Sequence, residues 1–221
     1  ERCLANPPPF NTDATASAFC DFAAGGDENV LAVRRGNLVR IVAAWREPDT
    51  MKAIGKFIQL FREQKIEAHQ IAADEGGLGI VMCDRLAENG WDVRRVNNGA
   101  PAYKCDTYAN KGAEMWFEGR TQIERQRIIL PNDKELVAQM TSRLGWPDSR
   151  GRLQLEPKEK MRARGLSSPD RADAVLGAMQ RNGDGGGSYS RLEAFSNRDA
   201  GLEILCGARI TGSRQRGRIL I

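Results

Sequence analysis

The sequence predicts an α/β fold with a mixed sheet, in which three antiparallel strands precede parallel strand–helix units and helices lie on both faces. Three observations support this prediction. Two runs of apolar and β-branched residues flank Gly36-Asn37, a two-residue hairpin signal. After Asp49 the apolar residues recur at helical spacing instead of alternating. Beyond that helix, short strand-like segments alternate with helical ones, as they do in βα units.

The first half of the chain supplies the antiparallel part of the sheet. Its strands are expected over residues 16–24, 28–35 and 38–45. A helix follows, with Asp49 or Thr50 as its N-cap. The buried face of this helix is predicted from its regularly spaced apolar residues, which are Met51, Ile54, Phe57, Ile58 and Phe61.

The second half supplies the strand–helix units. Strands are expected over residues 67–74, 91–96 and 151–157, and His69 is interpreted as a residue of the first of them rather than as a catalyst. Helices are expected over residues 78–89, 110–123 and 132–143. The last helix is predicted to have Ser168 as its N-cap and Pro169 at its first position, and to run to Met179.

Composition divides the 221 residues into three parts. Residues 1–14 contain the run PPPF and are expected to be a linker. Residues 15–180 carry the fold, and residues 181–221 are a glycine-rich, flexible segment with a tail in which 202–210 could add an edge strand. Because the chain begins with Glu1 rather than Met, we expect it to be part of a longer protein. No apolar run is long enough to span a bilayer, so no membrane partner is expected.

The residue counts exclude several kinds of site. A single histidine, His69, excludes any site that needs two imidazoles. The five cysteines form no CxxC pair, which argues against a zinc ribbon or a disulfide scaffold and favours reduced thiols inside a cell. The net charge is +4, and clusters of basic residues, such as the run that contains Arg162 and Arg164, are compatible either with a polyanion such as nucleic acid or with a solvated surface.

Three aspartates stand where an ionised group is costly. Asp21 interrupts the first apolar strand, unless it faces solvent. Asp74 ends the fourth strand, where it could also cap the next helix. Asp173 lies three residues before Leu176, at the edge of an apolar helical stripe, where it needs a cation, a donor network or a raised pKa. Asp170, in the first turn of the same helix, is favoured there by the helix dipole.

These aspartates predict a metal site. If the fourth strand lies beside the first, Asp21 and Asp74 project near one another and Asp173 reaches them from the last helix. Converging carboxylates repel unless divalent cations lie between them, and oxygen ligands select magnesium or manganese over zinc. Two such ions, roughly 3.5–4 Å apart, support phosphodiester hydrolysis. We therefore expect Asp21, Asp74 and Asp173 to hold two Mg²⁺ or Mn²⁺ ions, with Asp170 as a further candidate ligand.

Four blocks of sequence occur in the order CDFAAGGDEN, IAADEGGLGIVMCDRLAENGWDV, YANKGAEMWFEG and GRLQLEPKEKMRARGLSSPDRADAVLGAM. Taken together they resemble the nuclease domain of the large terminase subunit of tailed bacteriophages, over nearly all of residues 15–180. The last block is the most specific. The resemblance implies a ribonuclease-H-like fold, and it implies that Asp21, Asp74 and Asp173 are the acidic triad of that family.

The resemblance also suggests roles for basic residues. Lys158, in EPKEK, is similar to the lysine that commonly precedes the last helix of the family. Three roles are open for Lys158: it could position a phosphate, pair with an acid, or have a plain surface role. Lys104 and Lys111 flank the tyrosine-containing segment, and together with Arg162 and Arg164 they are candidates to face DNA.

The leading hypothesis is a metal-dependent endonuclease that cuts concatemeric viral double-stranded DNA during packaging. Family members carry an ATPase motor ahead of the nuclease, and this chain contains no GxxxxGK[ST] loop. The resemblance therefore implies a motor domain, a portal and a small terminase subunit as partners, in the cytoplasm of the host bacterium. Two alternatives stay open: a Holliday-junction resolvase or transposase-like nuclease of the same fold, and a nucleic-acid-binding module without catalysis.

Overall fold

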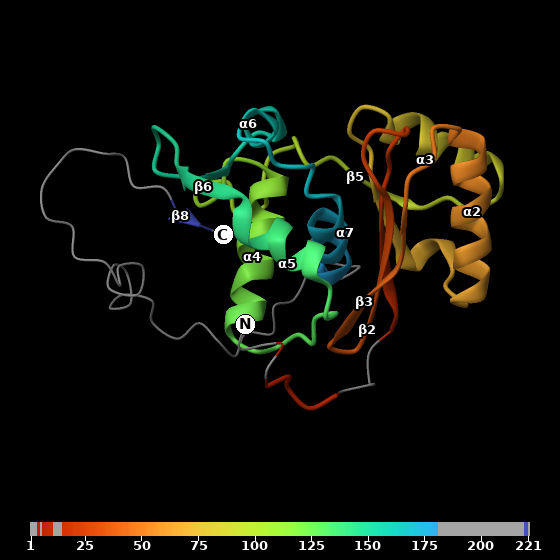
Figure 1. The fold of residues 1–221 in the computed structure, drawn as a ribbon, viewed down its shortest axis with the longest axis horizontal. Coiled ribbons are helices and arrows are strands. Elements are labelled where there is room, and N and C mark those ends of the chain that lie inside the picture. The colour runs from red at the N-terminus through yellow and green to blue at the C-terminus, as the bar shows by residue number, and fades with distance from the viewer. Residues whose placement is uncertain (1–3, 5, 11–14, 181–218, 221) are drawn as a thin grey trace, which may run out of the picture. The chain divides into compact units, whose positions relative to one another are not determined.

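The fold is organised around a five-stranded sheet with the order β3-β2-β1-β4-β5 (Figure 1). The computed structural model describes residues 4, 6–10, 15–180 and 219–220. The strands of the sheet are β1 (Ser17–Asp21), β2 (Asn29–Arg35), β3 (Leu38–Trp45), β4 (Ile71–Asp74) and β5 (Arg94–Val96). The first three strands are antiparallel, and β4 and β5 run parallel to β1, so the predicted mixed sheet is confirmed.

The hairpin between β2 and β3 turns at the predicted position. Arg35 pairs with Leu38, and Gly36 has a φ of 61°, a left-handed conformation that glycine adopts without steric cost. The central strand β1 pairs with β2 on one side and β4 on the other, so its carboxyl end lies in the middle of the sheet edge.

Side chains of the strands alternate between two hydrophobic cores. Ala18 and Cys20 belong to the core under α2 (Thr50–Glu63) and α3 (Gly79–Glu88), whereas Phe19 belongs to the core on the opposite face. The helices that cover the second face are α4 (Lys111–Glu124), α5 (Lys134–Ser142) and α7 (Asp170–Met179). The predicted helices are confirmed, and Asp49 is the N-cap of α2 through hydrogen bonds from the amides of Met51 and Lys52.

Helix α7 lies directly against the sheet, and nine of its ten residues are buried. Two glycines permit this close packing. A Cβ atom at Gly177 would lie 2.3 Å from the ring of Phe19 in β1, and one at Gly119 in α4 would lie 2.4 Å from Leu176. The absence of side chains at these positions therefore fixes how deeply α7 sits, and with it the position of its first turn.

A second, smaller sheet was not predicted. It has the order β7-β6-β8 and consists of β6 (Leu144–Pro147), β7 (Leu153–Leu155) and β8 (Ile219–Leu220). The strand expected over 151–157 is therefore shorter and belongs to this sheet. β6 and β7 form an antiparallel hairpin, and its tight turn is stabilised because Asp148 accepts hydrogen bonds from the amides of Arg150 and Arg152. The short helix α6 (Lys158–Ala163), also missed, links β7 to the segment before α7.

Three predicted strand boundaries were wrong because local hydrogen bonds replace the strand. The first strand ends at Asp21, since the amide of Ala23 donates to the Asn29 side chain. His69 lies in the 3₁₀ turn η1 (Ala68–Gln70) and is exposed, not in a strand. The strand expected over 91–96 starts only at Arg94, because the amide of Val93 donates to the Trp91 carbonyl.

The domain boundaries stay predictions. The edge strand expected over 202–210 lies outside the described residues, as does most of the linker expected over 1–14. Among the helices in the described ranges, none combines the length and the apolar composition needed to cross a membrane.

The role of Gly177 can be tested by substitution. Gly177→Ala should lower the free energy of unfolding by roughly 1–3 kcal/mol, because the added methyl group clashes with a buried aromatic ring. The matched control is Gly55→Ala in α2, where a Cβ meets no atom within 4 Å and the helix should gain roughly 0.5–1 kcal/mol. Urea denaturation measures both, and equal stability of Gly177→Ala and the wild type would contradict the packing argument.

Candidate metal centre

The ends of two parallel strands place Asp21 and Asp74 side by side. Cys20 of β1 is paired with Ala73 of β4, and the two aspartates are the next residues of their strands. Because Cys20 and Ala73 face α2 and α3, the alternation of side chains turns both carboxylates toward the face that α7 covers. The predicted adjacency of Asp21 and Asp74 follows from this register.

Asp21 is the least satisfied of the carboxylates. Its side chain is 7 % exposed, and within the described part of the chain Oδ2 is fully buried and has no hydrogen-bond partner. Burial raises the pKa of Asp21 well above its usual value; the charge of Lys158 opposes this, while Asp173, Asp170 and Asp74 add to it. The solvent-facing alternative for Asp21 is therefore wrong.

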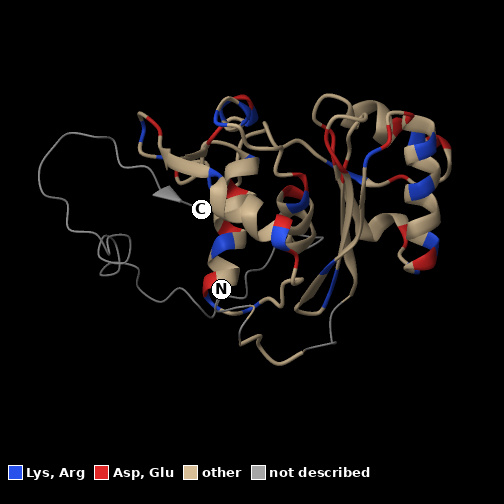
Figure 2. Ribbon diagram, viewed as in Figure 1, with Lys and Arg blue, Asp and Glu red and all other residues tan. Residues whose placement is uncertain are grey.

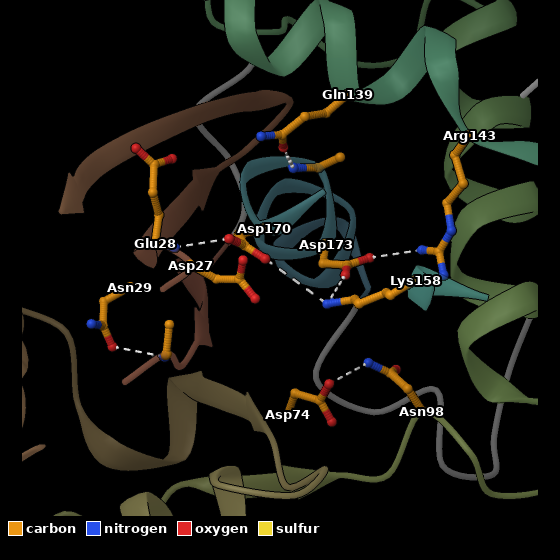
Figure 3. Close-up of polar contacts among 12 residues, drawn as sticks. Asp27, Glu28, Asn29, Asp74, Asn98, Gln139, Arg143, Lys158, Asp170 and Asp173 are labelled. Atoms are coloured by element: carbon orange, nitrogen blue, oxygen red, sulfur yellow. Dashed lines mark hydrogen bonds and ion pairs between the residues drawn. The ribbon is translucent and has the colours of Figure 1, made fainter. Parts of the chain in front are cut away.

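Asp74 is held at both oxygens. Oδ1 accepts from the amide of Gly76 at 2.9 Å, and Oδ2 accepts from Nδ2 of Asn98 at 2.9 Å (Figure 3). A Cβ atom at Gly79 would lie 1.9 Å from the backbone oxygen of Asp74, so α3 starts in contact with the main chain of this aspartate. The hydrogen bonds from Gly76 and Asn98 fix where the Asp74 carboxylate points.

The first turn of α7 contributes Asp170 and Asp173. Pro169, not Ser168, is the N-cap, and no side chain of the cap residue bonds the helix. Instead Gln139 of α5 accepts from the amide of Ala172 at 3.1 Å. Asp170 accepts at Oδ2 from the amide of Glu28 at 2.9 Å, and burial raises its pKa.

Asp173 is 6 % exposed and is surrounded by donors. Oδ1 accepts from Nε1 of Trp116 at 2.7 Å and from Nη1 of Arg143 at 3.3 Å, and Oδ2 lies 2.9 Å from Nζ of Lys158. Burial alone would raise the pKa of Asp173, but the charges of Lys158 and Arg143 and the hydrogen bonds from Lys158 and Trp116 hold it below its usual value. The donor network that the sequence required is therefore present.

Lys158 supplies the positive charge at the centre of this cluster. It is the first residue of α6, and Nζ lies 2.9 Å from Asp173 and 3.9 Å from Asp170 (Figure 3). Burial disfavours its charged form, but Asp173, Asp21 and Asp170 outweigh burial and raise its pKa above the usual value. Of the three roles considered for Lys158, pairing with an acid is the one that the contacts show.

The side chains fit a divalent cation by their chemistry. In the part of the chain that the structure describes, no three His, Cys, Asp or Glu side chains form a ready-made coordination group, and Lys158 lies between two of the aspartates, Asp170 and Asp173. The available donors are nevertheless all carboxylate oxygens, which suits magnesium or manganese. The buried, unpartnered Oδ2 of Asp21 is the atom whose environment most requires a cation.

The other four predicted DNA-contacting residues have partners inside the protein. Lys104 pairs with Glu118 at 2.6 Å, and Lys111 lies over the Tyr103 ring at 4.3 Å. Arg162 contacts Asp27 at 2.7 Å, and Nε of Arg164 donates to the buried Glu156 at 2.8 Å. Acidic and basic residues are interspersed on α4 and α6 (Figure 2). Contact of these residues with DNA stays a prediction.

Sequence reasoning missed three side chains that hold the aspartates: Asn98, Trp116 and Arg143. Asn98 follows β5 by two residues, and a polar residue at the carboxyl end of a parallel strand was a usable signal. Trp116 is 1 % exposed and belongs to the core, where its indole N–H also binds Asp173. Nothing in the sequence near Arg143 pointed to Asp173, 30 residues away.

Burial of Asp21 predicts how stability depends on pH in the absence of metal. Its pKa is raised in the folded state, so the unfolded chain loses this proton first and stability falls as pH rises from the unfolded pKa toward the folded one. In EDTA, Asp21→Asn should therefore have a higher Tm than the wild type at pH 8, with the difference shrinking as pH falls toward about 4. A difference independent of pH would contradict the raised pKa.

Comparisons with solved structures identify domains with a similar fold. The nuclease domain of the large terminase subunit gp2 of bacterial virus Sf6 matches with a TM-score of 0.69 and 18 % identity, over 78 % of this chain and 90 % of that one. A lysine-to-alanine mutant of the same domain with manganese matches with a TM-score of 0.66, 14 % identity and coverages of 78 % and 91 %.

A second phage domain agrees with this result. The large terminase nuclease from thermophilic phage G20c with bound magnesium matches with a TM-score of 0.54 and 15 % identity, over 77 % of this chain and 84 % of that one. No family model and no curated protein sequence matches the chain. The predicted ribonuclease-H-like mixed sheet is confirmed, and the chain has the fold of the nuclease domains of phage large terminase subunits.

Proposed function

We propose that this chain is a metal-dependent DNA endonuclease domain of a viral packaging terminase, which hydrolyses phosphodiester bonds in concatemeric double-stranded DNA. The observation that carries the proposal is the buried Oδ2 of Asp21, which lacks a hydrogen-bond partner in the described chain and lies in a cluster with Asp74, Asp170 and Asp173. A module that only bound nucleic acid would gain nothing from burying three of these carboxylates, those of Asp21, Asp170 and Asp173, which repel a polyanion.

In this proposal some residues bind the cations and others orient the side chains that bind them. Asp21 and Asp74, at the ends of neighbouring strands, would hold the first cation, and Asp173 would hold the second, with Asp170 beside it. When bound, two such cations activate a water and stabilise the leaving oxygen of a phosphodiester. Asn98 and the Gly76 amide orient Asp74, so that its carboxylate does not have to reorganise when a cation binds.

Lys158 has a second task in this proposal. In the absence of cations it neutralises Asp173 and Asp170. Its side chain is one-third exposed, so it can also contact a phosphate of the substrate. Lys104, Lys111, Arg162 and Arg164 would contact the DNA backbone, with weak sequence preference and a strong dependence on salt. An ATPase motor, a portal and a small terminase subunit are proposed partners, in the host bacterial cytoplasm.

Cleavage of plasmid DNA tests the proposal. Asp21→Asn and Asp173→Asn should each lower the rate in Mg²⁺ or Mn²⁺ by at least about 100-fold, because each removes a charged ligand. The matched control is Asp92→Asn, the same change at an exposed aspartate, which should cleave at the wild-type rate. Full activity of both site variants would refute the assignment, and a strong preference of the wild type for four-way junctions would favour a resolvase instead.

Metal binding can be measured without cleavage. Millimolar Mn²⁺ or Mg²⁺ should raise the Tm of the wild type, since a ligand that binds only the folded state stabilises it. Asp21→Asn should abolish this shift while Asp92→Asn retains it. Zinc should not restore cleavage after EDTA treatment, because the available ligands are oxygens. The absence of any shift in the wild type would mean that the aspartates hold no cation.

A further inference from the structure

The two oxygens of Asp173 have different partners. Oδ1 accepts two hydrogen bonds, from the indole N–H of Trp116 at 2.7 Å and from the guanidinium of Arg143 at 3.3 Å. Oδ2 lies 2.9 Å from the ammonium of Lys158 (Figure 3). Trp116 comes from α4 and Arg143 from the end of α5, so two helices converge on a single oxygen of α7.

Both donors are rigidly placed. Trp116 is 1 % exposed, and the guanidinium of Arg143 lies 4.7 Å from the centre of the Trp116 ring, which packs the two side chains against each other. Arg143 also donates through Nε to the carbonyl of Glu156 at 3.2 Å, and the carboxylate of Glu156 is held by Arg164. Because these side chains are fixed by packing and by their own hydrogen bonds, they determine the orientation of Asp173 rather than following it.

We propose that Trp116 and Arg143 are positioning residues that fix Asp173 through Oδ1, so that Asp173 offers only Oδ2 to a bound Mg²⁺ or Mn²⁺ ion. The inference rests on the proposed function, since it concerns the same metal site. Turning Oδ1 toward a cation would break two hydrogen bonds in a buried environment, both of them charge-assisted because the acceptor is a carboxylate. Lys158, which contacts Oδ2, is partly exposed and has a flexible side chain, so Oδ2 is the oxygen that can exchange its partner.

Removal of the indole N–H tests the inference. Trp116→Phe keeps an aromatic ring against Arg143 but deletes the hydrogen bond to Asp173. The Mn²⁺ concentration that gives half of the maximal Tm shift should rise roughly 10–100-fold, as is typical when a residue that orients a metal ligand is lost. The matched control is Trp91→Phe, because Trp91 packs on Phe61 in the opposite core. It should leave the half-saturating concentration unchanged.

Kinetics separate positioning from a general loss of structure. With plasmid DNA in Mn²⁺, Trp116→Phe should lower kcat and leave KM for DNA close to the wild-type value, because Trp116 is buried and is none of the residues proposed to contact DNA. Part of the lost rate should return at high Mn²⁺ concentration. A variant that was merely less stable would be almost fully folded when assayed well below its own Tm, and it would then keep the wild-type kcat.

A measurement on the wild type remains decisive if Trp116→Phe does not fold. The chain has four tryptophans, whose indole N–H signals in a ¹H–¹⁵N spectrum can be assigned by elimination with Trp45→Phe, Trp91→Phe and Trp146→Phe. Titration with Mg²⁺ should shift the signal of Trp116, since its N–H reports on the charge at Asp173, and should leave that of Trp91 in place.

The outcomes distinguish the two proposals. If the wild type binds Mn²⁺ and cleaves DNA, but Trp116→Phe has the same half-saturating concentration and the Trp116 signal does not move, the positioning role is refuted and the nuclease proposal stands. If the wild type shows no Tm shift and no cleavage, the nuclease proposal fails, and the positioning role fails with it.

Discussion

Repulsion among the buried aspartates constrains the whole candidate site. Two like charges at about 4 Å cost about 4 kcal/mol at an effective dielectric constant of about 20, a large part of the stability of an ordinary domain. The protein limits this cost in two ways. Lys158 lies between Asp173 and Asp170, and the pKa values of neighbouring carboxyls are driven apart, down for Asp173 and up for Asp21. Such divergence is typical of functional sites.

The packing of α7 against the sheet sets the positions of Asp170 and Asp173 relative to Asp21 and Asp74. The site needs the first turn of α7 beside the ends of β1 and β4, and this requires the helix to lie close to the sheet along its length. Gly177 and Gly119 allow that approach by leaving room for Phe19 and Leu176. A larger residue at either position would lift the helix from the sheet and move Asp173 away from Asp21, so residues far from the carboxylates help to determine the distances among them.

The main sheet and the aspartates were predictable because their signals are local or follow from topology. The Gly36 turn, the switch in apolar period after Asp49 and the acid inside an apolar strand are each visible in a short window. The donors to Asp173 were not, since Trp116 and Arg143 reach it across 57 and 30 residues and have no pattern that marks them. Of the second sheet only β7 was expected, within the strand over 151–157; β6 and β8 have four and two residues and carry no alternating apolar pattern.

The aspartates of the site differ in the number of donors that contact them, and this difference indicates where a cation would bind. Asp173 has three donors and Asp74 has two, so donors of the protein itself contact both carboxylates. Asp21 gains the favourable charge of Lys158, but its Oδ2 accepts no hydrogen bond from any residue that the structure describes. A buried oxygen without a hydrogen-bond partner destabilises the folded protein, and such an oxygen is found mainly where a bound ion or ligand contacts it. The oxygen that most requires a cation is therefore Oδ2 of Asp21, at the end of β1 in the middle of the sheet edge, where Asp21 and Asp74 end neighbouring strands.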